Sequence, residues 1–385
     1  MKREGCGKKV LVAMSGGVDS SVAAALLKER GYEVVGCFMR LGSDDSVEAA
    51  DATDWQTSDS TVATGESKRK HQGCCSLNDA ADARLVAATL NVPFYGLNFK
   101  EEFSRIIDDF VDEYNRGRTP NPCIRCNNWL KFGKLAAYAE SIDADFVATG
   151  HYARVDHTPN RSRLLKGKDR QKDQSYVLFG TPQSRLQHML LPLGELDKPQ
   201  VRALARQWKL PVFAKPDSQE ICFVPDGNYF HLVKQRSPDL VGRGQVVDGK
   251  GNILGEHDGH QHFTIGQRRG LSVSLGHPIY VTDKNPQTNT ITVGPRERTY
   301  ADTLQADQVN WLTEPSVDRP LRCTAKIRSN GPGQPASVRV TGPDTLEVHF
   351  DQPLRAISPG QAVVCYDGDE VMGGGWIRSV VSSDS

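Results

Sequence analysis

The stretch that decides the fold is "KVLVAMSGGVDSSVAAALLKERGYEVVGCFM", residues 9–39. Its apolar runs at 9–14 and 33–39 are typical of buried strands. Between them, residues 20–30 have helical periodicity and end at Gly31, a usual residue just past a helix C-terminus. Strand, helix and strand in this order predict a β-α-β unit, in which the two strands are parallel neighbours.

The same alternation of strands and helices continues outward to about residue 215. In 101–117, apolar residues recur at helical spacing and predict one buried face. Farther on, "DFVATGH" at 145–151 predicts a later strand that ends at the carboxyl edge of the sheet, where ligands of open α/β sheets bind. The residues that predict the buried helix face are Phe103, Ile106, Ile107, Phe110, Val111 and Tyr114.

Three regions follow from these patterns: an α/β domain at 1–215 with a Rossmann-like parallel sheet, a small β-rich domain at 216–298 and an antiparallel β-barrel at 299–385. Gly-rich turns break up the middle region, and period-two alternation marks the last one. Within the first domain, residues 43–72 hold nine Ser or Thr and seven Asp or Glu with little apolar content. This composition predicts a disordered insertion.

Composition excludes several classes of protein. The chain has 385 residues, and its 47 Lys and Arg balance 47 Asp and Glu, so a polyanionic partner would need local basic patches. No apolar run approaches the ~18–20 residues of a membrane helix, and there is no export-signal pattern, so we expect a cytoplasmic protein without a membrane partner. Nine Cys are too few for a disulfide scaffold and predict reactive or metal-binding thiols.

The strongest chemical signal is "SGGVDS", residues 15–20, between a predicted strand and a predicted helix. Glycines let the backbone approach a phosphate closely, and the first amides of the helix point at the anion. Ser15 and Ser20 add hydroxyl donors. The loop has no Lys for terminal phosphates, so an ordinary kinase or GTPase loop does not fit.

Three cysteines are candidates for chemistry. Cys126 precedes a helix expected to start near Asn127 or Asn128, where a thiol gains a lowered pKa and nucleophilicity. Cys222, between Ile and Phe, taken alone is typical of a packed core residue. Cys123 and Cys126 form a C-x-x-C, and with Cys222 they could hold an iron-sulfur cluster or zinc; two thiols without a metal are the other interpretation.

Five further motifs identify a family. They are "GRTPNPCIRCN" at 117–127, "ATGHYAR" at 148–154, "KDQSYVL" at 172–178, "DSQEICF" at 217–223 and "HFTIGQRRGL" at 262–271. With "SGGVDS" they resemble the tRNA-specific 2-thiouridylases of the PP-loop ATP pyrophosphatases, in the expected order over about residues 9–378. The resemblance implies that the protein binds ATP as its nucleotide, together with Mg²⁺. The residues that it implies at ATP are Ala13, Met14, Ser15, Gly16, Gly17, Val18, Asp19, Ser20, Met39 and Gly150, with Asp19 close to the metal.

The resemblance also implies a reaction. The wobble uridine, position 34, would be adenylated at its 2-carbonyl oxygen and thiolated to 2-thiouridine, with AMP and pyrophosphate released. Cys222 would carry the persulfide, loaded by a cysteine desulfurase or a sulfur-relay protein, and Cys126 would be the nucleophile that forms a disulfide with it. The implied tRNAs read Lys, Glu and Gln codons. Many relatives have Asp at position 123, so Cys123 leaves the acid/base role, or cluster ligation, open.

The residues that the family resemblance places at tRNA are Asn121, Pro122, Cys123, His151, Lys172, Asp173, Gln174, Arg328, Ser329 and Gln361. An aromatic residue is common in relatives at position 329, where Ser329 can offer only a hydroxyl. Residues 161–172 hold six Lys or Arg against one Asp, which favours either phosphate contacts or a solvated hairpin.

Two rival functions stay open on the sequence. One is a PP-loop ligase or amidating enzyme that acts on a small molecule and needs no cysteine pair. The other is a non-catalytic RNA-binding or sulfur-relay protein that carries a persulfide on Cys222 without consuming ATP.

Overall fold

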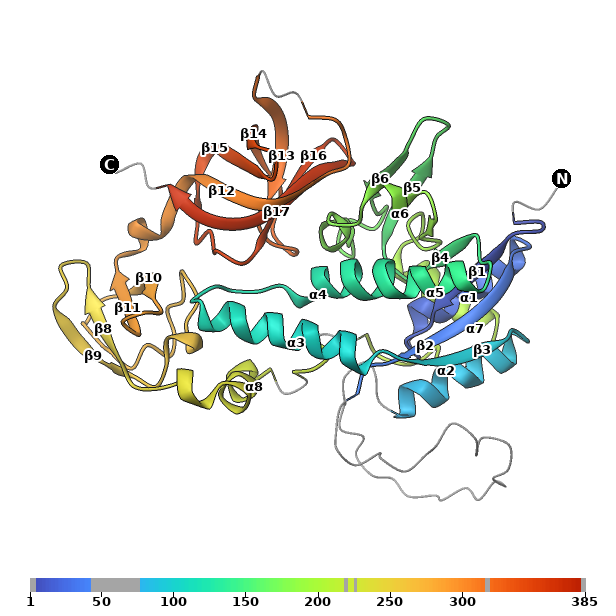
Figure 1. The fold of residues 1–385 in the computed structure, drawn as a ribbon, viewed down its shortest axis with the longest axis horizontal. Helices are drawn as coiled ribbons and strands as arrows, with labels where there is room; N and C mark the ends of the chain where they lie inside the picture. The colour runs from blue at the N-terminus through green and yellow to red at the C-terminus, as the bar shows by residue number, and fades with distance from the viewer. Residues whose placement is uncertain (1–4, 43–76, 218–220, 225–226, 316–318, 382–385) are drawn as a thin grey trace.

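The computed structural model describes residues 5–42, 77–217, 221–224, 227–315 and 319–381. The insertion predicted at 43–72 lies outside these residues. Figure 1 shows an α/β body at one end, a barrel, and a small sheet region beside the far end of α3. None of the helices in the described ranges is long and apolar enough to cross a lipid bilayer.

A five-stranded parallel sheet forms the centre of the first region, in the order β3-β2-β1-β4-β7. Its strands are β1 (Lys9–Ala13), β2 (Glu33–Arg40), β3 (Phe94–Asn98), β4 (Phe146–Ala148) and β7 (Met189–Leu190). Val10 on β1 is paired with Val34 on one side and with Phe146 on the other. The apolar run that predicted β1 is therefore the middle of the sheet, covered on both faces, and the predicted parallel α/β fold is confirmed.

Alternate residues of β1 enter two different cores, because side chains of a strand point to opposite faces. Val10 and Val12 pack with the helices of one face, and Leu11 and Ala13 pack with those of the other face. The first face is covered by α1 (Val18–Glu29), α2 (Leu77–Thr89) and α7 (Lys198–Gln207), and the second by α3 (Lys100–Asn115) and α5 (Leu135–Ser141). All six apolar residues that predicted the buried face of α3 are buried.

The helix that carries the C-x-x-C begins earlier than expected. It starts as α4 (Pro122–Arg125), continues as a π-helix (Cys126–Lys134) and runs on into α5. The start predicted near Asn127 or Asn128 is wrong because Pro122, whose fixed φ suits the first turn of a helix, begins the helix instead.

The C-terminal region is a closed six-stranded antiparallel barrel, in the order β12-β15-β14-β13-β16-β17, with β12 also paired to β17. The strands are β12 (Tyr300–Trp311), β13 (Leu321–Lys326), β14 (Gln334–Gly342), β15 (Thr345–Arg355), β16 (Ala362–Asp367) and β17 (Glu370–Val381). Leu346, Val348 and Phe350 alternate into its core, as the period-two pattern predicted. A hairpin of the first region, β5 (Ala153–His157) and β6 (Ser162–Lys166), extends this sheet through the pair of Leu165 and Glu370.

Between these two regions along the chain comes a small four-stranded sheet in the order β10-β11-β8-β9, beside α8 (Tyr229–Arg236). Its strands are β8 (Gly244–Asp248), β9 (Ile253–His257), β10 (Tyr280–Asn285) and β11 (Thr290–Gly294). The remaining short helices are α6 (Gln183–Leu186), η2 (Ser175–Leu178), η3 (Pro238–Leu240), η4 (His260–His262) and η5 (Arg296–Thr299). A second, small β-rich unit was predicted; the domain boundaries at 215/216 and 298/299 stay predictions.

Candidate active site

A cavity of ≈ 310 Å³ lies beside the carboxyl ends of β1, β2 and β4. The predicted nucleotide residues that line it are Ala13, Ser15, Gly17, Val18, Asp19, Ser20, Met39 and Gly150. Lining residues to which the sequence assigned no role are Asp79, Lys131, Thr149, Tyr152, Lys215, Pro216 and Asp217. The sheet edge at which a ligand was predicted is thus hollowed, and a smaller hollow of ≈ 110 Å³ beside α5 contains none of the predicted site residues.

The loop before α1 is folded tightly upon itself. Ser15 N–H donates to Ser20 Oγ over 3.1 Å, and Ser21 Oγ donates to Gly17 O over 2.8 Å. Gly16 has φ +73°, and a Cβ there would lie 2.2 Å from the carbonyl oxygen of Asp79. Only glycine fits this position, and the fold leaves the first amides of α1 beside the cavity, an arrangement suited to an anion.

Three of the predicted nucleotide positions have roles in packing. A Cβ on Gly150 would lie 2.7 Å from Ser20 N, so the end of β4 touches the loop backbone itself. Met14 is buried, and a Cβ on Gly36 would lie only 2.7 Å from its Sδ. Met14 and Gly16 are absent from the cavity lining, so they shape the loop from behind it.

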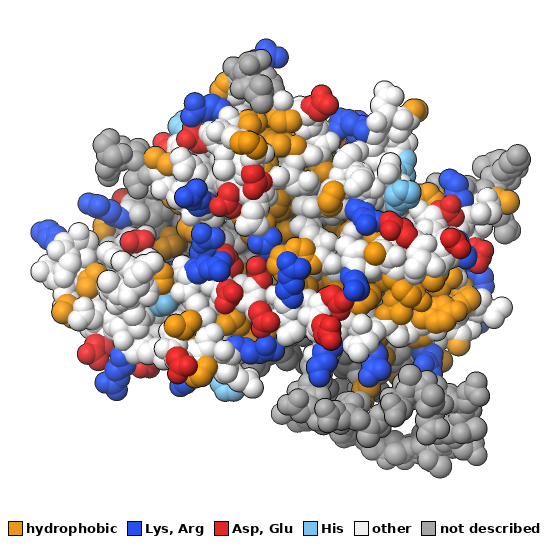
Figure 2. Space-filling model, in the orientation of Figure 1, with side chains coloured by type: hydrophobic (Ala, Val, Ile, Leu, Met, Phe, Trp, Pro, Cys, Tyr) orange, Lys and Arg blue, Asp and Glu red, His pale blue; other side chains and the backbone are white. Residues whose placement is uncertain are grey.

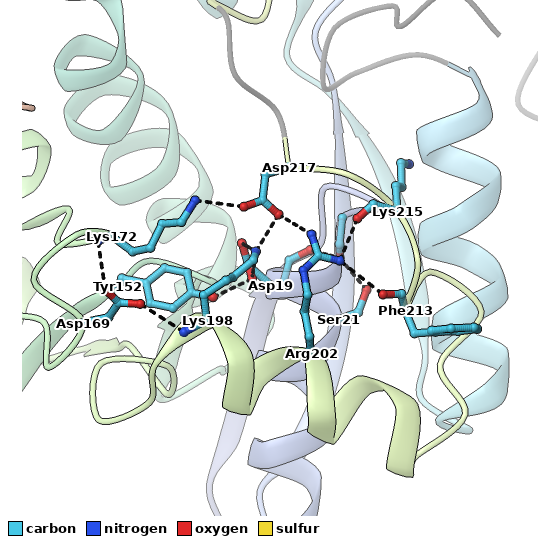
Figure 3. Close-up of polar contacts among 12 residues, drawn as sticks. Asp19, Ser21, Tyr152, Asp169, Lys172, Lys198, Arg202, Phe213, Lys215 and Asp217 are labelled. Carbon is cyan, nitrogen blue, oxygen red and sulfur yellow. Dashed lines mark hydrogen bonds and ion pairs between the residues drawn. The ribbon is translucent and has the colours of Figure 1, made fainter. Parts of the chain in front are cut away.

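Asp19 is held by two donors that the sequence did not identify (Figure 3). Lys198 Nζ lies 2.8 Å from Asp19 Oδ1 and 2.9 Å from Oδ2, and Tyr152 OH donates to Oδ1 over 2.8 Å. Burial, together with the nearby Asp19 carboxylate, raises the pKa of Tyr152, so its hydroxyl stays a donor. Asp19 is therefore fixed in place at the first turn of α1.

Lys198 is positioned by local sequence. It is the first residue of α7, whose start is fixed by a capping box: Gln200 N–H donates to Asp197 Oδ1 (2.8 Å), and Asp197 N–H donates to Gln200 Oε1 (2.9 Å). The signal "DKPQ" predicts such a helix start, but nothing local shows that its lysine reaches Asp19.

Asp217 gathers three cations in front of the loop (Figure 3). Its carboxylate lies 2.7 Å from Lys198 Nζ, 3.0 Å from Lys172 Nζ and 2.8 Å from an Arg202 guanidinium nitrogen. Burial raises the pKa of Asp217, but the hydrogen bonds from Lys198 and Lys172 outweigh it, and the pKa is lowered. Asp217 therefore stays ionised.

A further cation approaches from the end of the first region. Lys215 Nζ lies 2.6 Å from both Asp79 and Asp82 and donates to Gly16 O over 3.0 Å. Burial lowers the pKa of Lys215, but the hydrogen bonds with the two carboxylates raise it overall. The fold thus supplies the lysines that "SGGVDS" lacks, from positions nearly 200 residues beyond that loop in the sequence.

Three predicted tRNA residues line this cavity: His151, Lys172 and Gln174. His151 is buried, and Thr149 Oγ1 lies 2.6 Å from its Nδ1. Burial, with a smaller effect of the Lys131 charge, lowers the pKa of His151 well below its usual value, so the ring is neutral near pH 7. Asp173 is different, because it accepts hydrogen bonds from Gly167 N–H and Ser175 N–H, and so shapes a turn.

Cys126 and Cys222 lie outside the cavity lining and pack, half-buried, against the apolar core that includes α3. Beside Cys222, the Phe223 ring lies 5.1 Å from that of Phe110 on α3. Cys126 lies one turn inside its helix, and not at the N-terminus. The expected activation of Cys126 by unpaired N-terminal amides therefore does not apply, because the backbone N–H of Cys126 already donates within the helix, to Pro122 O.

Metal ligation by the cysteines has no geometric support. Cys123 is exposed in the first turn of α4, whereas Cys126 and Cys222 are half-buried. In the described ranges, no three His, Cys, Asp or Glu side chains are grouped so that they could hold a metal ion. An iron-sulfur cluster or zinc on Cys123, Cys126 and Cys222 is therefore not supported.

The barrel holds the segment that leads to α4. Gln361 Nε2 donates to Thr119 O over 2.8 Å and to Pro120 O over 3.2 Å, and Thr119 N–H donates to Pro359 O over 2.8 Å. Gln361, predicted to contact tRNA, thus orients the backbone just before Asn121 and Pro122, which are half-buried and buried respectively.

The other predicted tRNA residues of the barrel lie at the β13–β14 turn. There Arg328 donates to Ala356 O over 2.5 Å, and Ser329 is half-buried.

The basic stretch 161–172 begins at the second strand of the β5–β6 hairpin, and several of its arginines form ion pairs within the molecule. Arg161 lies 2.7 Å from Glu370, Arg170 lies 2.7 Å from Asp369, and Arg163 pairs with Asp156. These cations are neutralised within the molecule, so the phosphate-binding interpretation of the stretch is not supported for them. Figure 2 likewise shows Lys and Arg side chains mixed with Asp and Glu on the face in view.

Comparison with known proteins identifies the family. A family model described as "tRNA methyl transferase HUP domain" matches residues 8–226, "tRNA methyl transferase PRC-barrel domain" matches 231–295, and "Aminomethyltransferase beta-barrel domain" matches 301–377. A "tRNA-specific 2-thiouridylase MnmA" of Rhodopirellula baltica is 45% identical over 97% of both chains. One of Carboxydothermus hydrogenoformans is 48% identical over 96% of this chain and 98% of its own. The chain belongs to the tRNA-specific 2-thiouridylase family.

Two of the family models are described as methyl transferase domains. The two relatives above match this 2-thiouridylase family member over nearly its whole length, and both are named thiouridylases. Among solved structures, an NMN synthetase from Francisella tularensis covers 60% of this chain and 78% of its own, at 16% identity and a TM-score of 0.31. That similarity is too low to carry an inference.

Proposed function

We propose that this chain is an ATP-dependent tRNA sulfurtransferase that converts the wobble uridine, position 34, to 2-thiouridine. The observation that carries the proposal is similarity to 2-thiouridylases over nearly the full length of both chains. The relatives reported above are thiouridylases and not small-molecule ligases, so the ligase alternative is not favoured.

The cavity beside "SGGVDS" fits ATP. Ser15, Gly17 and Ser20 offer amides and hydroxyls to the phosphates, and Lys172 and Lys215 bring positive charge to the same space. Met39, at the end of β2, would lie near the base. Asp19 is the residue that would hold Mg²⁺, which supplies charge neutralisation at the phosphates.

The reaction has two steps at uridine C2. First, the 2-carbonyl oxygen attacks the α-phosphorus, a phosphorus–oxygen bond forms, and pyrophosphate leaves with the electron pair of the bond that breaks. Ring N3 releases a proton that the product regains. A uridine turned out of the anticodon into this cavity would meet His151 and Gln174, which line it.

In the second step, the terminal sulfur of a Cys222 persulfide bonds to C2, and AMP leaves with the electrons of the carbon–oxygen bond. The Cys126 thiolate then attacks Cys222 Sγ, and the electrons of the broken sulfur–sulfur bond stay on the sulfur attached to C2. A disulfide joins Cys126 and Cys222, and an external dithiol resets it by giving two electrons. Cys123, exposed near the helix start, is a candidate for proton transfer.

The partners complete the proposal. The persulfide sulfur would come from a cysteine desulfurase, directly or through a relay protein, and the substrates would be the tRNAs that read Lys, Glu and Gln codons. Arg328 and Ser329 on the barrel would contact tRNA. The cytoplasmic location expected from the sequence stays a prediction.

The test is nucleoside mass spectrometry of unmodified tRNA incubated with the protein, Mg-ATP, a cysteine desulfurase, cysteine and a dithiol. We expect 2-thiouridine that depends on ATP and is lost in Cys126→Ala. Cys6→Ala, at an exposed cysteine far from Cys126 in the sequence, is the matched control and should keep wild-type activity. Wild-type protein that forms no 2-thiouridine under these conditions would contradict the proposal.

A further inference from the structure

Lys131 differs from the other lysines of the cavity. Lys172 shares Asp217 with Lys198 and Arg202, and Lys215 pairs with Asp79 and Asp82, so each of these two lysines has a carboxylate partner at rest. Lys131 lines the same cavity, yet within the described part of the chain no carboxylate forms an ion pair with it. A half-buried cation without a local counter-charge attracts an anionic ligand.

The π-helix determines where Lys131 lies. In an α-helix of 3.6 residues per turn, residue i+5 lies well round the helix from residue i. In a π-helix, hydrogen bonds join residues i and i+5, so Cys126 and Lys131 share one side of the helix, about one turn apart. The lysine thus belongs to the same rigid element as the proposed nucleophile.

Other contacts hold this helix in its register. Asn127 is buried, and its side-chain amide donates to Val177 O over 2.9 Å. A Cβ on Gly133 would lie 2.8 Å from Asn128 O, five residues earlier, so glycine is required by the wider turn. The position of Lys131 therefore does not depend on its own side-chain contacts.

We propose that Lys131 is a catalytic residue that contacts the α-phosphate of the nucleotide. This inference rests on the proposed function and deepens it, since nothing in "SGGVDS" supplies a cation there. The lysine lies on the element that joins the phosphate-binding cavity to Cys126, where the adenylated uridine must sit to be reached by sulfur. Its charge also acts on His151, another residue of the cavity.

Lys131 would act twice on the same phosphate. As the uridine oxygen attacks, the α-phosphate gains negative charge while pyrophosphate leaves. When sulfur bonds to C2 and the carbon–oxygen bond breaks, AMP leaves as a phosphate anion with that electron pair. A fixed ammonium group stabilises both changes of charge without itself exchanging a proton.

The test measures tRNA-dependent pyrophosphate release in a Cys126→Ser background, where adenylation is separated from the thiol steps. We expect Lys131→Ala to lower kcat for pyrophosphate release by about 100-fold, the usual effect of losing one preorganised charge, and to change KM for ATP much less. Lys131→Arg, which keeps the charge, should recover part of the rate.

Lys134→Ala is the matched control, since Lys134 is on the same π-helix, is 57% exposed and pairs with Glu102. It removes the same charge and should leave pyrophosphate release unchanged. Pyrophosphate release that is unaffected by Lys131→Ala while thiolation falls would overturn the inference, because Lys131 would then act on the thiol. A wild-type protein that neither releases pyrophosphate nor thiolates tRNA would instead overturn the proposed function, and this inference with it.

Discussion

The nucleotide cavity and the junction between the β5–β6 hairpin and the barrel are built from the same kinds of ion pairs but differ in exposure. At the cavity, the side chains of Asp217, which lines it, and of Lys198, which pairs with Asp217, are 21% and 11% exposed. At the junction, those of Arg170 and Asp369 are 53% and 39% exposed. The arginines of the charge-rich stretch thus form the outer, structural contact, whereas the cavity draws single cations from scattered positions, Lys172 at the end of that stretch among them.

This difference implies different energetic consequences. Exposed ion pairs contribute little because water and salt screen them, whereas removing one partner of a buried pair leaves a charge without compensation. Substitutions in the cavity should therefore affect both activity and stability strongly, and those at the junction should have small effects.

The largest expected effect is on catalysis at Asp19. Asp19→Asn keeps the shape of the side chain but removes the charge that Lys198 and Tyr152 hold in place. We expect tRNA-dependent pyrophosphate release to fall by about a thousandfold, near the upper end for loss of one preorganised group. Activity within threefold of wild type would show that the cavity does not work as proposed.

The next effect is on stability at Lys198. Lys198→Met keeps most of the apolar stem but leaves Asp19 and Asp217 without their shared cation. We expect the free energy of unfolding to fall by about 3 kcal/mol, the low end for a broken buried pair, because Asp19 is 32% exposed. Urea unfolding measures this free energy. A loss no greater than that caused by breaking the exposed ion pairs at the junction would contradict the proposed difference between the two regions.

A third prediction concerns pH and His151. Burial holds its pKa well below 6.5, so only the unfolded chain gains a proton as the pH falls through that value. The contribution of His151 to the free energy of unfolding is therefore fully present above about pH 7. It is lost on acidification, by roughly 1 kcal/mol between about pH 7.5 and 5.5. We expect the unfolding free energy of His151→Gln to fall less over this range than that of wild type.

His157 on the hairpin is the control for this pH dependence. Burial also lowers the pKa of His157, but its hydrogen bond with Met189 O opposes that shift. His157→Gln should therefore flatten the pH dependence less than His151→Gln does. An equal effect of the two variants would contradict the assigned cause.

The smallest effect is expected at the junction. Asp369→Asn removes the partner of Arg154 and Arg170, 2.8 Å and 2.7 Å away. Because both pairs are partly exposed, we expect a loss of less than about 1 kcal/mol that shrinks further in high salt, with unchanged pyrophosphate release. A loss as large as that of Lys198→Met would show that the junction is a main source of stability.

Local patterns predicted much of the fold. The apolar runs at 9–14 and 33–39 are β1 and β2 to within one residue, and the apolar face of 101–117 is the buried face of α3. Periodicity succeeds here because burial of a strand or helix face leaves its period in the sequence. The helix start expected near Asn127 or Asn128 was wrong, because Pro122 itself fits the first turn of a helix.

The candidate site was predicted only in part. "SGGVDS" marked the anion-binding loop, because its glycines and hydroxyls act through the local backbone. The lysines around it could not be found in this way, since Lys198 and Lys215 reach Asp19 and Gly16 only after the chain has folded.

By itself, then, the sequence determined the parallel sheet, the closed barrel and the phosphate-type loop, because periodicity and backbone conformation are local properties. Only the tertiary structure decided which charges meet. It neutralises Arg161 and Arg170 against the barrel, and it leaves Lys131 in the cavity without a described carboxylate partner. The physical reason is that electrostatic interactions depend on distance and burial in space, and separation along the chain fixes neither.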